Sequence, residues 1–147
     1  MTLFLLLTAC KKTHLKNDVC DCADSQSTFV VDTITLTIPN LFTPNDDGIN
    51  DTWLIININK FTDAKVKVIQ PGLFGGTVFE SSGNIQAWDG ENNGHNLKDG
   101  KYKYEITVAN GQTFTGYVCK YNGLTQPKNS DCLKNCVTID RNDPVVN

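Results

Sequence analysis

A repeated alternation of apolar and polar side chains constrains the fold of this chain more than any other feature. In residues 30–38 apolar residues alternate with threonines, and in residues 65–69 valines alternate with lysines. Successive side chains of a strand point to opposite faces of a sheet, so a period of two indicates half-buried strands. The pattern predicts strands at residues 30–38, 53–58, 65–69, 77–80, 85–88, 101–108 and 113–121.

Turn signals separate these segments. Pro39 ends the first predicted strand, because proline cannot donate to a strand ladder. Asn110-Gly111, between the last two, predicts a two-residue hairpin turn whose residues both adopt positive φ. Short strands at this spacing, with no amphipathic helix of useful length, predict an all-β, immunoglobulin-like antiparallel β-sandwich of about seven strands.

Length and charge limit the domain count and the classes of partner. A chain of 147 residues supports one domain with flanking segments. The net charge of −3 argues against nucleic acid, whose phosphates call for clustered Lys and Arg. We expect a signal segment at 1–9, a flexible tether at 10–28, the sandwich at 29–123 and a cysteine-containing tail at 124–147.

The N-terminus has the pattern of an exported lipoprotein. An apolar run at residues 3–7, too short to span a bilayer, precedes Thr8, Ala9 and Cys10. The quartet 7–10 resembles the bacterial lipobox, which implies cleavage before Cys10, lipidation of that cysteine and attachment to a membrane through the acyl chains. No Lys or Arg precedes the run, and a short buried hydrophobic segment is the alternative.

Three segments stand out in a fixed order. Residues 42–53 read Phe-Thr-Pro-Asn-Asp-Asp-Gly-Ile-Asn-Asp-Thr-Trp, residues 78–81 read Val-Phe-Glu-Ser, and Trp-Asp-Gly at 88–90 is followed by Asp-Gly-Lys-Tyr at 99–102. Over about residues 38–121 this order resembles the gliding motility-associated C-terminal domain family, the type B sorting domain of type IX secretion substrates. The residues that carry the resemblance are Phe42, Pro44, Asn45, Asp47, Gly48, Asn50, Asp51, Trp88, Asp89, Gly90, Gly100 and Tyr102.

The resemblance implies both a fold and a role. The fold is an immunoglobulin-like sandwich, and the role is recognition by the outer-membrane translocon and attachment to the cell surface. With the lipobox, it implies a non-enzymatic lipoprotein of the outer membrane or cell surface whose partners are envelope or secretion-system proteins. The alternative is a surface adhesion or glycan-binding module that uses loops at one end of the sandwich.

Four residues of the first segment form a candidate metal site. Asn45, Asp47, Asn50 and Asp51 crowd oxygen donors around Gly48, and Ca²⁺ prefers six to eight such ligands. The alternative is an Asx-rich turn whose side chains hydrogen-bond their own backbone. The sequence leaves both open, and calcium is the only cofactor it suggests.

Aromatic residues are better candidates for the core than for a ligand platform. Trp53 and Trp88 begin or end predicted strands, where a large ring usually buries its face. Tyr102 and Tyr104 share one face of a strand, and inner-face packing is favoured over sugar stacking. His14 and His95 have no nucleophile in a recognisable arrangement, so we expect no enzyme.

Six cysteines in an exported chain indicate an oxidising compartment. If Cys10 is lipidated, an odd number remains, and at least one thiol is free or intermolecular. We predict that disulfides join the cysteines before the sandwich to those after it and so pin the tail; a Cys₄ metal site is the alternative, with spacings that fit zinc poorly. The tail segment 137–139 either extends a sheet edge or docks on a partner. The disulfide candidates are Cys20, Cys22, Cys119, Cys132 and Cys136.

Overall fold

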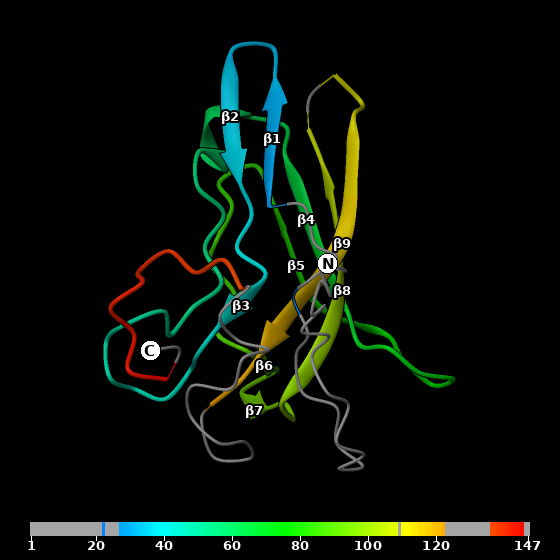
Figure 1. Cartoon of the computed structure of the whole chain (residues 1–147). Helices are drawn as coiled ribbons and strands as arrows, with labels where there is room; N and C mark the ends of the chain where they lie inside the picture. The colour runs from blue at the N-terminus through cyan, green and yellow to red at the C-terminus, as the bar shows by residue number, and fades with distance from the viewer. Residues whose placement is uncertain (1–21, 23–26, 109, 123–135, 146–147) are drawn as a thin grey trace, which may run out of the picture.

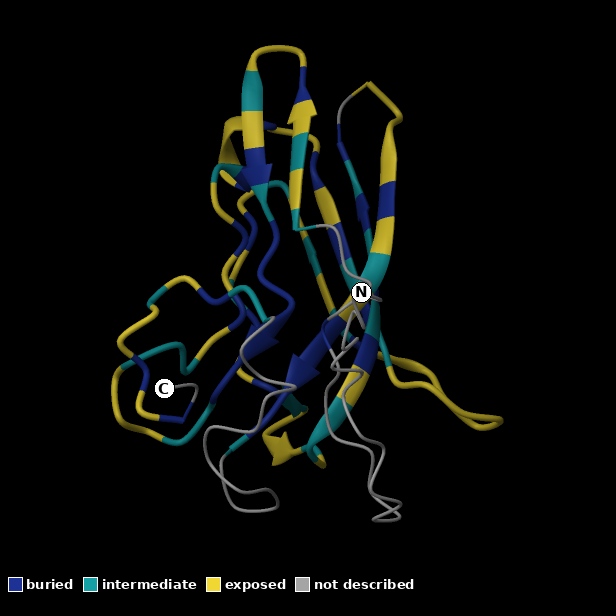
Figure 2. Cartoon of the chain, in the orientation of Figure 1, coloured by how far each residue is buried: buried dark blue, intermediate teal, exposed yellow. Residues whose placement is uncertain are grey.

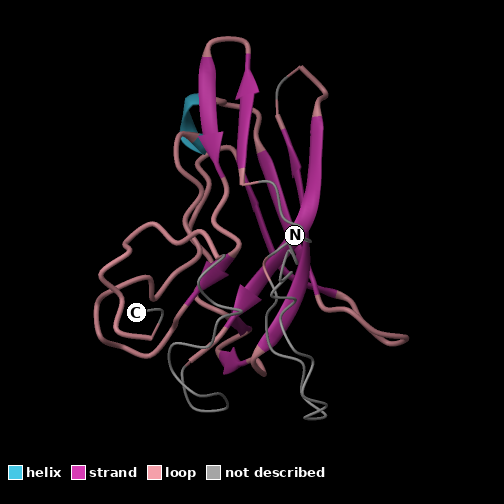
Figure 3. Ribbon diagram, viewed as in Figure 1, coloured by secondary structure: helices cyan, strands magenta, loops and turns pink. Residues whose placement is uncertain are grey.

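The computed structural model describes residues 22, 27–108, 110–122 and 136–145 (Figure 1). Within these residues nearly all regular structure is strand, which confirms the predicted all-β class (Figure 3). The elements are β1 Thr28–Val31, β2 Ile34–Thr37, β3 Leu41–Phe42, the 3₁₀ helix η1 Ile58–Lys60, β4 Lys65–Ile69, β5 Thr77–Ser82, β6 Glu91–Asn92, β7 His95–Asn96, β8 Gly100–Thr107 and β9 Thr113–Lys120.

One layer of the sandwich is a five-stranded sheet in the order β3-β9-β8-β4-β5. The long hairpin of β8 and β9 forms its centre, with its turn where Asn110-Gly111 predicts one. The turn is longer than the expected two residues, because the Val108 N–H donates to the Gln112 carbonyl and the Gly111 N–H to the Val108 carbonyl; Gly111 has a φ of 79°. The pairs β9-β8, β8-β4 and β4-β5 are antiparallel. The pair β3-β9 is parallel, so the sheet is mixed where an antiparallel one was expected. Strands β3 and β5 are its two edges.

The second layer is less regular and differs most from prediction. The expected strand at 30–38 is a hairpin of β1 and β2, because Asp32, with a φ of 54°, turns the chain. The expected strand at 53–58 is not continuous, since Asn57 takes a left-handed conformation and leads into η1. The layer is completed by isolated antiparallel bridges between Thr37 and Ile56 and between Trp53 and Trp88.

The core lies between the layers. Alternate residues of β4 and β8 are buried, as the two-residue period predicts (Figure 2); β9 follows the period as far as Val118, and its residues 118–120 are all buried. Trp53 and Trp88 are both fully enclosed, which agrees with their expected role in the core. The core cluster includes Leu36, Ile38, Phe42, Trp53, Ile58, Phe61, Trp88, Tyr102, Tyr104, Ile106 and Phe114.

Two very short strands complete the fold. β6 and β7 pair antiparallel around Asn93-Gly94, whose residues have φ values of 52° and 76°. No helix among the described residues is long and apolar enough to cross a membrane.

Candidate functional site

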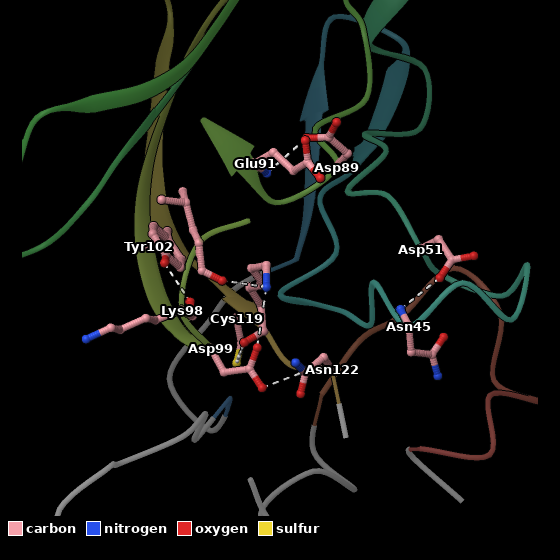
Figure 4. Close-up of polar contacts among 11 residues, drawn as sticks. Asn45, Asp51, Asp89, Glu91, Lys98, Asp99, Tyr102, Cys119 and Asn122 are labelled. Carbon is pink, nitrogen blue, oxygen red and sulfur yellow. Dashed lines mark hydrogen bonds and ion pairs between the residues drawn. The ribbon is translucent and has the colours of Figure 1, made fainter. Parts of the chain in front are cut away.

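The three motif segments converge on one aromatic cluster in the core. The ring of Trp88 lies 5.2 Å from that of Phe42 and 5.2 Å from that of Tyr102, centroid to centroid. Phe42 belongs to the first segment, and Trp88 and Tyr102 belong to the third. Phe79, from the second segment, lies 6.4 Å from Trp88 between ring centroids, so the cluster ties β3, β5, the 88–90 turn and β8 together. The polar atoms of both rings are hydrogen-bonded. Trp88 Nε1 donates to the Glu91 carbonyl at 2.9 Å. The Tyr102 hydroxyl donates to the Lys98 carbonyl at 2.6 Å (Figure 4).

A buried ion pair lies at the end of this cluster. Lys120 has no exposed surface, and its ammonium group donates to the Leu97 carbonyl at 2.8 Å and lies 3.4 Å from Asp99 Oδ1. The other oxygen of Asp99 accepts the backbone N–H of Asn122 at 3.0 Å (Figure 4). Burying a charge is tolerated only when it is paired and hydrogen-bonded, and these contacts meet that condition.

Sequence reasoning did not single out this lysine. Its signal is the phase of β9: Phe114, Val118 and Lys120 are an even number of residues apart and share the inner face. A lysine in phase with core residues indicates a buried charge that needs a partner. Burial raises the pKa of the Tyr102 phenol above its ordinary value, and the Asp99 carboxylate raises it further. Burial also raises the pKa of Tyr104.

The 88–90 motif closes a tight turn beside this pair. Asp89 Oδ1 accepts the backbone N–H of Glu91 at 2.9 Å (Figure 4), and Gly90 has a φ of 83°. The backbone of Gly90 packs against the Lys120 side chain, and its carbonyl accepts the N–H of Leu97. Gly100, at the start of β8, has a φ of 149°, so both motif glycines occupy backbone conformations that favour glycine.

The candidate calcium residues form a turn that is closed by N–H donors. Asp51 accepts the backbone N–H groups of Asn45 at 3.0 Å, Asp46 at 2.8 Å and Gly48 at 2.7 Å. Asp47 Oδ1 accepts the backbone N–H of Ile49 at 2.8 Å. This is the geometry of the Asx-turn alternative.

Calcium binding at this turn remains a prediction. Among the described residues, no three His, Cys, Asp or Glu side chains are grouped so as to hold a metal ion. Asn50, the fourth candidate ligand, points instead at the C-terminal segment: its side chain donates to the Asp140 carbonyl at 2.7 Å and accepts the Asp140 N–H at 2.9 Å.

We refer to residues 136–145 as the strap, because this segment lies along the motif turn (Figure 1). Its Asp143 has no exposed surface, and Oδ2 accepts the Thr43 hydroxyl and the Asn50 amide, the latter at 2.9 Å. The Val137 N–H donates to Asn40 Oδ1, and the Asn40 N–H donates to the Val137 carbonyl. The strap is therefore hydrogen-bonded to the residue just before β3. Sequence reasoning identified a docked or edge-pairing tail but did not place it on the motif turn.

A disulfide fixes the strap to the residue before the sandwich. Cys22 and Cys136 are bonded, which confirms the predicted link between the two flanks. Cys119 is also disulfide-bonded. Cys10, Cys20 and Cys132 lie outside the described residues.

Two further features bear on function. His95 lies exposed in β7, and His14 lies outside the described residues. Leu73 and Phe74, at the tip of the β4-β5 loop, are 93% and 97% exposed, and this loop projects away from the sandwich (Figure 2).

Comparison with protein families matches residues 36–119 to the CHU_C type IX secretion signal domain. Comparisons with curated proteins and with solved structures gave no match. The matched segment runs from β2 to β9 and contains the aromatic cluster, the turn at 45–51 and Asp99. More than half of the chain is covered, so the protein belongs to the CHU_C type IX secretion signal domain family.

Proposed function

We propose that this protein is a lipid-anchored envelope protein whose sandwich is recognised by the type IX secretion machinery through protein contacts. The observation that carries the proposal is the family match, because it spans the sandwich from β2 to β9. Membership of this family supports a role in type IX sorting and a secreted or surface location. The specific contacts and the anchor are the proposal.

The lipid anchor is supported by the sequence of the N-terminus. Leu7-Thr8-Ala9-Cys10 has the order of a lipobox, and two lysines follow at once. Metabolic labelling with a clickable fatty acid tests it: the wild-type chain is expected to carry the label, and Cys10→Ser to lose it. Equal labelling of both proteins would exclude this anchor.

A binding role without catalysis is the simplest use of the site. The polar groups of the motif are occupied in structural contacts: Tyr102 binds Lys98, Asp89 binds Glu91, and Asp99 binds Asn122. A nucleophile and its base need side chains within hydrogen-bond reach in a cleft, and the motif places its residues in turns and in the core instead.

The experiment that tests the sorting role is a reporter fusion. Residues 20–147 are placed behind a periplasmic reporter, so that the sandwich, strap and disulfide are all retained. The reporter is expected at the cell surface in a wild-type background and in the periplasm of a strain without the translocon. A reporter that stays in the periplasm in both strains would remove the sorting role.

The adhesion alternative is favoured by one observation, the exposed loop tip. Leu73 and Phe74 present apolar surface on a projecting loop, and exposed aromatic residues are common anchors of interfaces. Saturable binding on a glycan or cell-surface panel, lost in Leu73→Ser/Phe74→Ser, would support this role. The same variant is not expected to alter translocon-dependent export.

A further inference from the structure

The surface beneath the strap has the chemistry of a peptide-binding site. It consists of Asn40, Leu41, Thr43, Asn50 and Tyr121, and in this structure it is covered by the chain's own residues 136–145. Because the occupant is present, its contacts reveal what the surface recognises.

The first element is a site for one carboxylate. Asp143 is fully buried, and its Oδ2 accepts from the Thr43 hydroxyl and from Asn50 Nδ2. Its Oδ1 accepts the N–H of Val145 at 2.8 Å, a bond within the strap itself. Hydrogen bonds to an ionised acceptor are roughly twice as strong as neutral ones, so this position selects an acidic residue.

The second element reads the backbone of the occupant. Asn40 donates its N–H to the Val137 carbonyl at 3.1 Å, and its side-chain oxygen accepts the Val137 N–H at 2.7 Å. Asn50 makes the same two-way pairing with the backbone of Asp140. Such contacts bind main-chain atoms of the occupant and do not depend on its side chains.

The third element is an apolar anchor. The side chain of Val145 is 2% exposed and belongs to a small cluster with Leu41, Tyr121 and the two cysteines of the bridge. Carboxylate and anchor are two residues apart in a turn, which the bond from the Val145 N–H to Asp143 Oδ1 closes, so both side chains reach the same surface.

The strap does not satisfy this surface completely. Asn40 is 3% exposed, and its Nδ2 has no hydrogen-bond partner among the described residues. A buried donor without an acceptor is unfavourable, because it has lost its hydrogen bond to water without gaining another. A segment that places a carbonyl oxygen there would therefore bind better than the strap does.

The surface and the strap also differ in whether the family match covers them. Asn40, Thr43 and Asn50 lie inside the matched segment 36–119, whereas the strap lies beyond it. Most of the receptor surface thus lies within the matched segment, whereas Tyr121 and the strap lie outside it.

We propose that this surface binds an acidic segment of a partner protein, which presents an Asp-x-Val-like turn, and that the strap is a tethered competitor. The Cys22–Cys136 bridge holds the strap in place. A tethered occupant acts at an effective concentration of roughly millimolar, so a partner competes well only when the bridge is open. The inference does not rest on the sorting role, and a purified chain without any translocon tests it.

The test uses a fluorescent peptide with the sequence of residues 136–145, carrying Cys136→Ser, and fluorescence anisotropy on the full chain. The receptor is the chain with Cys22→Ser, Cys136→Ser and Asp143→Asn, in which both bridge and competing carboxylate are removed. The peptide is expected to bind this variant about tenfold or more tightly than it binds the oxidised wild-type chain. A peptide with Asp143→Asn is expected to bind about tenfold or more weakly than its parent.

A second receptor variant shows whether a failure to bind is caused by loss of folding. The Cys22→Ser/Cys136→Ser chain retains Asp143, and it should rank the two peptides in the same order at weaker affinity. Two results overturn the proposal. One is a folded receptor that binds neither peptide or binds both equally. The other is a receptor that dimerises and leaves the peptide unbound, which would identify a second copy as the occupant.

Discussion

Gly90 packs so closely on Lys120 that a Cβ built on the glycine would stand 2.5 Å from Lys120 Cε and 3.3 Å from Phe42 Cζ. This contact explains physically why the 88–90 motif ends in glycine: the position needs both a φ of 83° and the absence of a side chain. The family motif here packs against a buried lysine and the aromatic cluster.

We expect Gly90→Ala to lower the free energy of unfolding by about 3 kcal/mol, from backbone strain and overpacking together. Urea unfolding of the purified chain measures it. Gly94→Ala is the matched control, because Gly94 has a φ of 76° and open space where the methyl group would stand. That control should lose only about 1 kcal/mol. Equal losses in the two variants would show that the contact with Lys120 contributes nothing.

The Lys120–Asp99 pair should behave as a buried ion pair. Lys120→Met leaves the Asp99 carboxylate, whose side chain is 6% exposed, without its cation, and we expect a loss of about 3–5 kcal/mol. The double variant Lys120→Met/Asp99→Asn removes both charges and should lose less than Lys120→Met alone. A double-mutant cycle by urea unfolding gives the coupling. Additive losses would contradict direct pairing.

The Cys22–Cys136 bridge should contribute substantially to stability. It joins residues 114 apart in the sequence, and closing so long a loop stabilises by about 4 kcal/mol in the chain-entropy model. Cys22→Ser/Cys136→Ser is therefore expected to lower the melting temperature. A paired substitution is preferable to a reductant, because Cys119 is disulfide-bonded as well. An unchanged melting temperature would mean that the strap contacts alone hold the two flanks.

The strands that could be predicted from the sequence are those in which apolar residues recur at every second position. β4 and β8 show the two-residue period along their length, β9 shows it as far as Val118, and Asn110-Gly111 marks the turn between β8 and β9. The buried tryptophans and the bridge between flanks follow from residue type and position. These features depend on local sequence, where a few residues already determine the outcome.

The features that were missed depend on pairing between distant residues. β3 has only two residues, too few to show a period, and it exists because it pairs with β9. Asp143 meets Asn50, 93 residues earlier in the chain, through side-chain contacts that leave no periodic signal. The break at Asn57 was missed because a left-handed residue inside an apolar run does not alter hydrophobic spacing.

Asp51 should stabilise the motif turn through its three backbone N–H contacts. Asp51→Ala, compared with Asp63→Ala at an exposed turn, is expected to cost about 1–2 kcal/mol in the presence of a chelator. Calorimetric titration of the wild-type chain and of Asp51→Ala with Ca²⁺ tests calcium binding at the same turn. Heat on addition of Ca²⁺ to the wild-type chain that is lost in Asp51→Ala would establish a calcium site. No heat and no shift in melting temperature would leave the Asx turn as the only role.

Alkaline pH should destabilise the fold through Tyr102 and Tyr104. Burial raises the pKa of both phenols above 10.0, and Asp99 raises that of Tyr102 further. Below about pH 10 both phenols are protonated in the folded and unfolded chain, so their contribution is fully present. Above it the unfolded chain loses these protons first, and the unfolding free energy falls by up to about 1.4 kcal/mol per pH unit for each group.

Urea unfolding across this range should therefore show a shallower fall in the unfolding free energy for Tyr102→Phe than for the wild-type chain. The variant starts about 1 kcal/mol lower, because it loses the hydrogen bond to Lys98. Parallel curves for the two proteins would mean that the Tyr102 phenol keeps the same pKa on folding, against the burial that the aromatic cluster imposes on it.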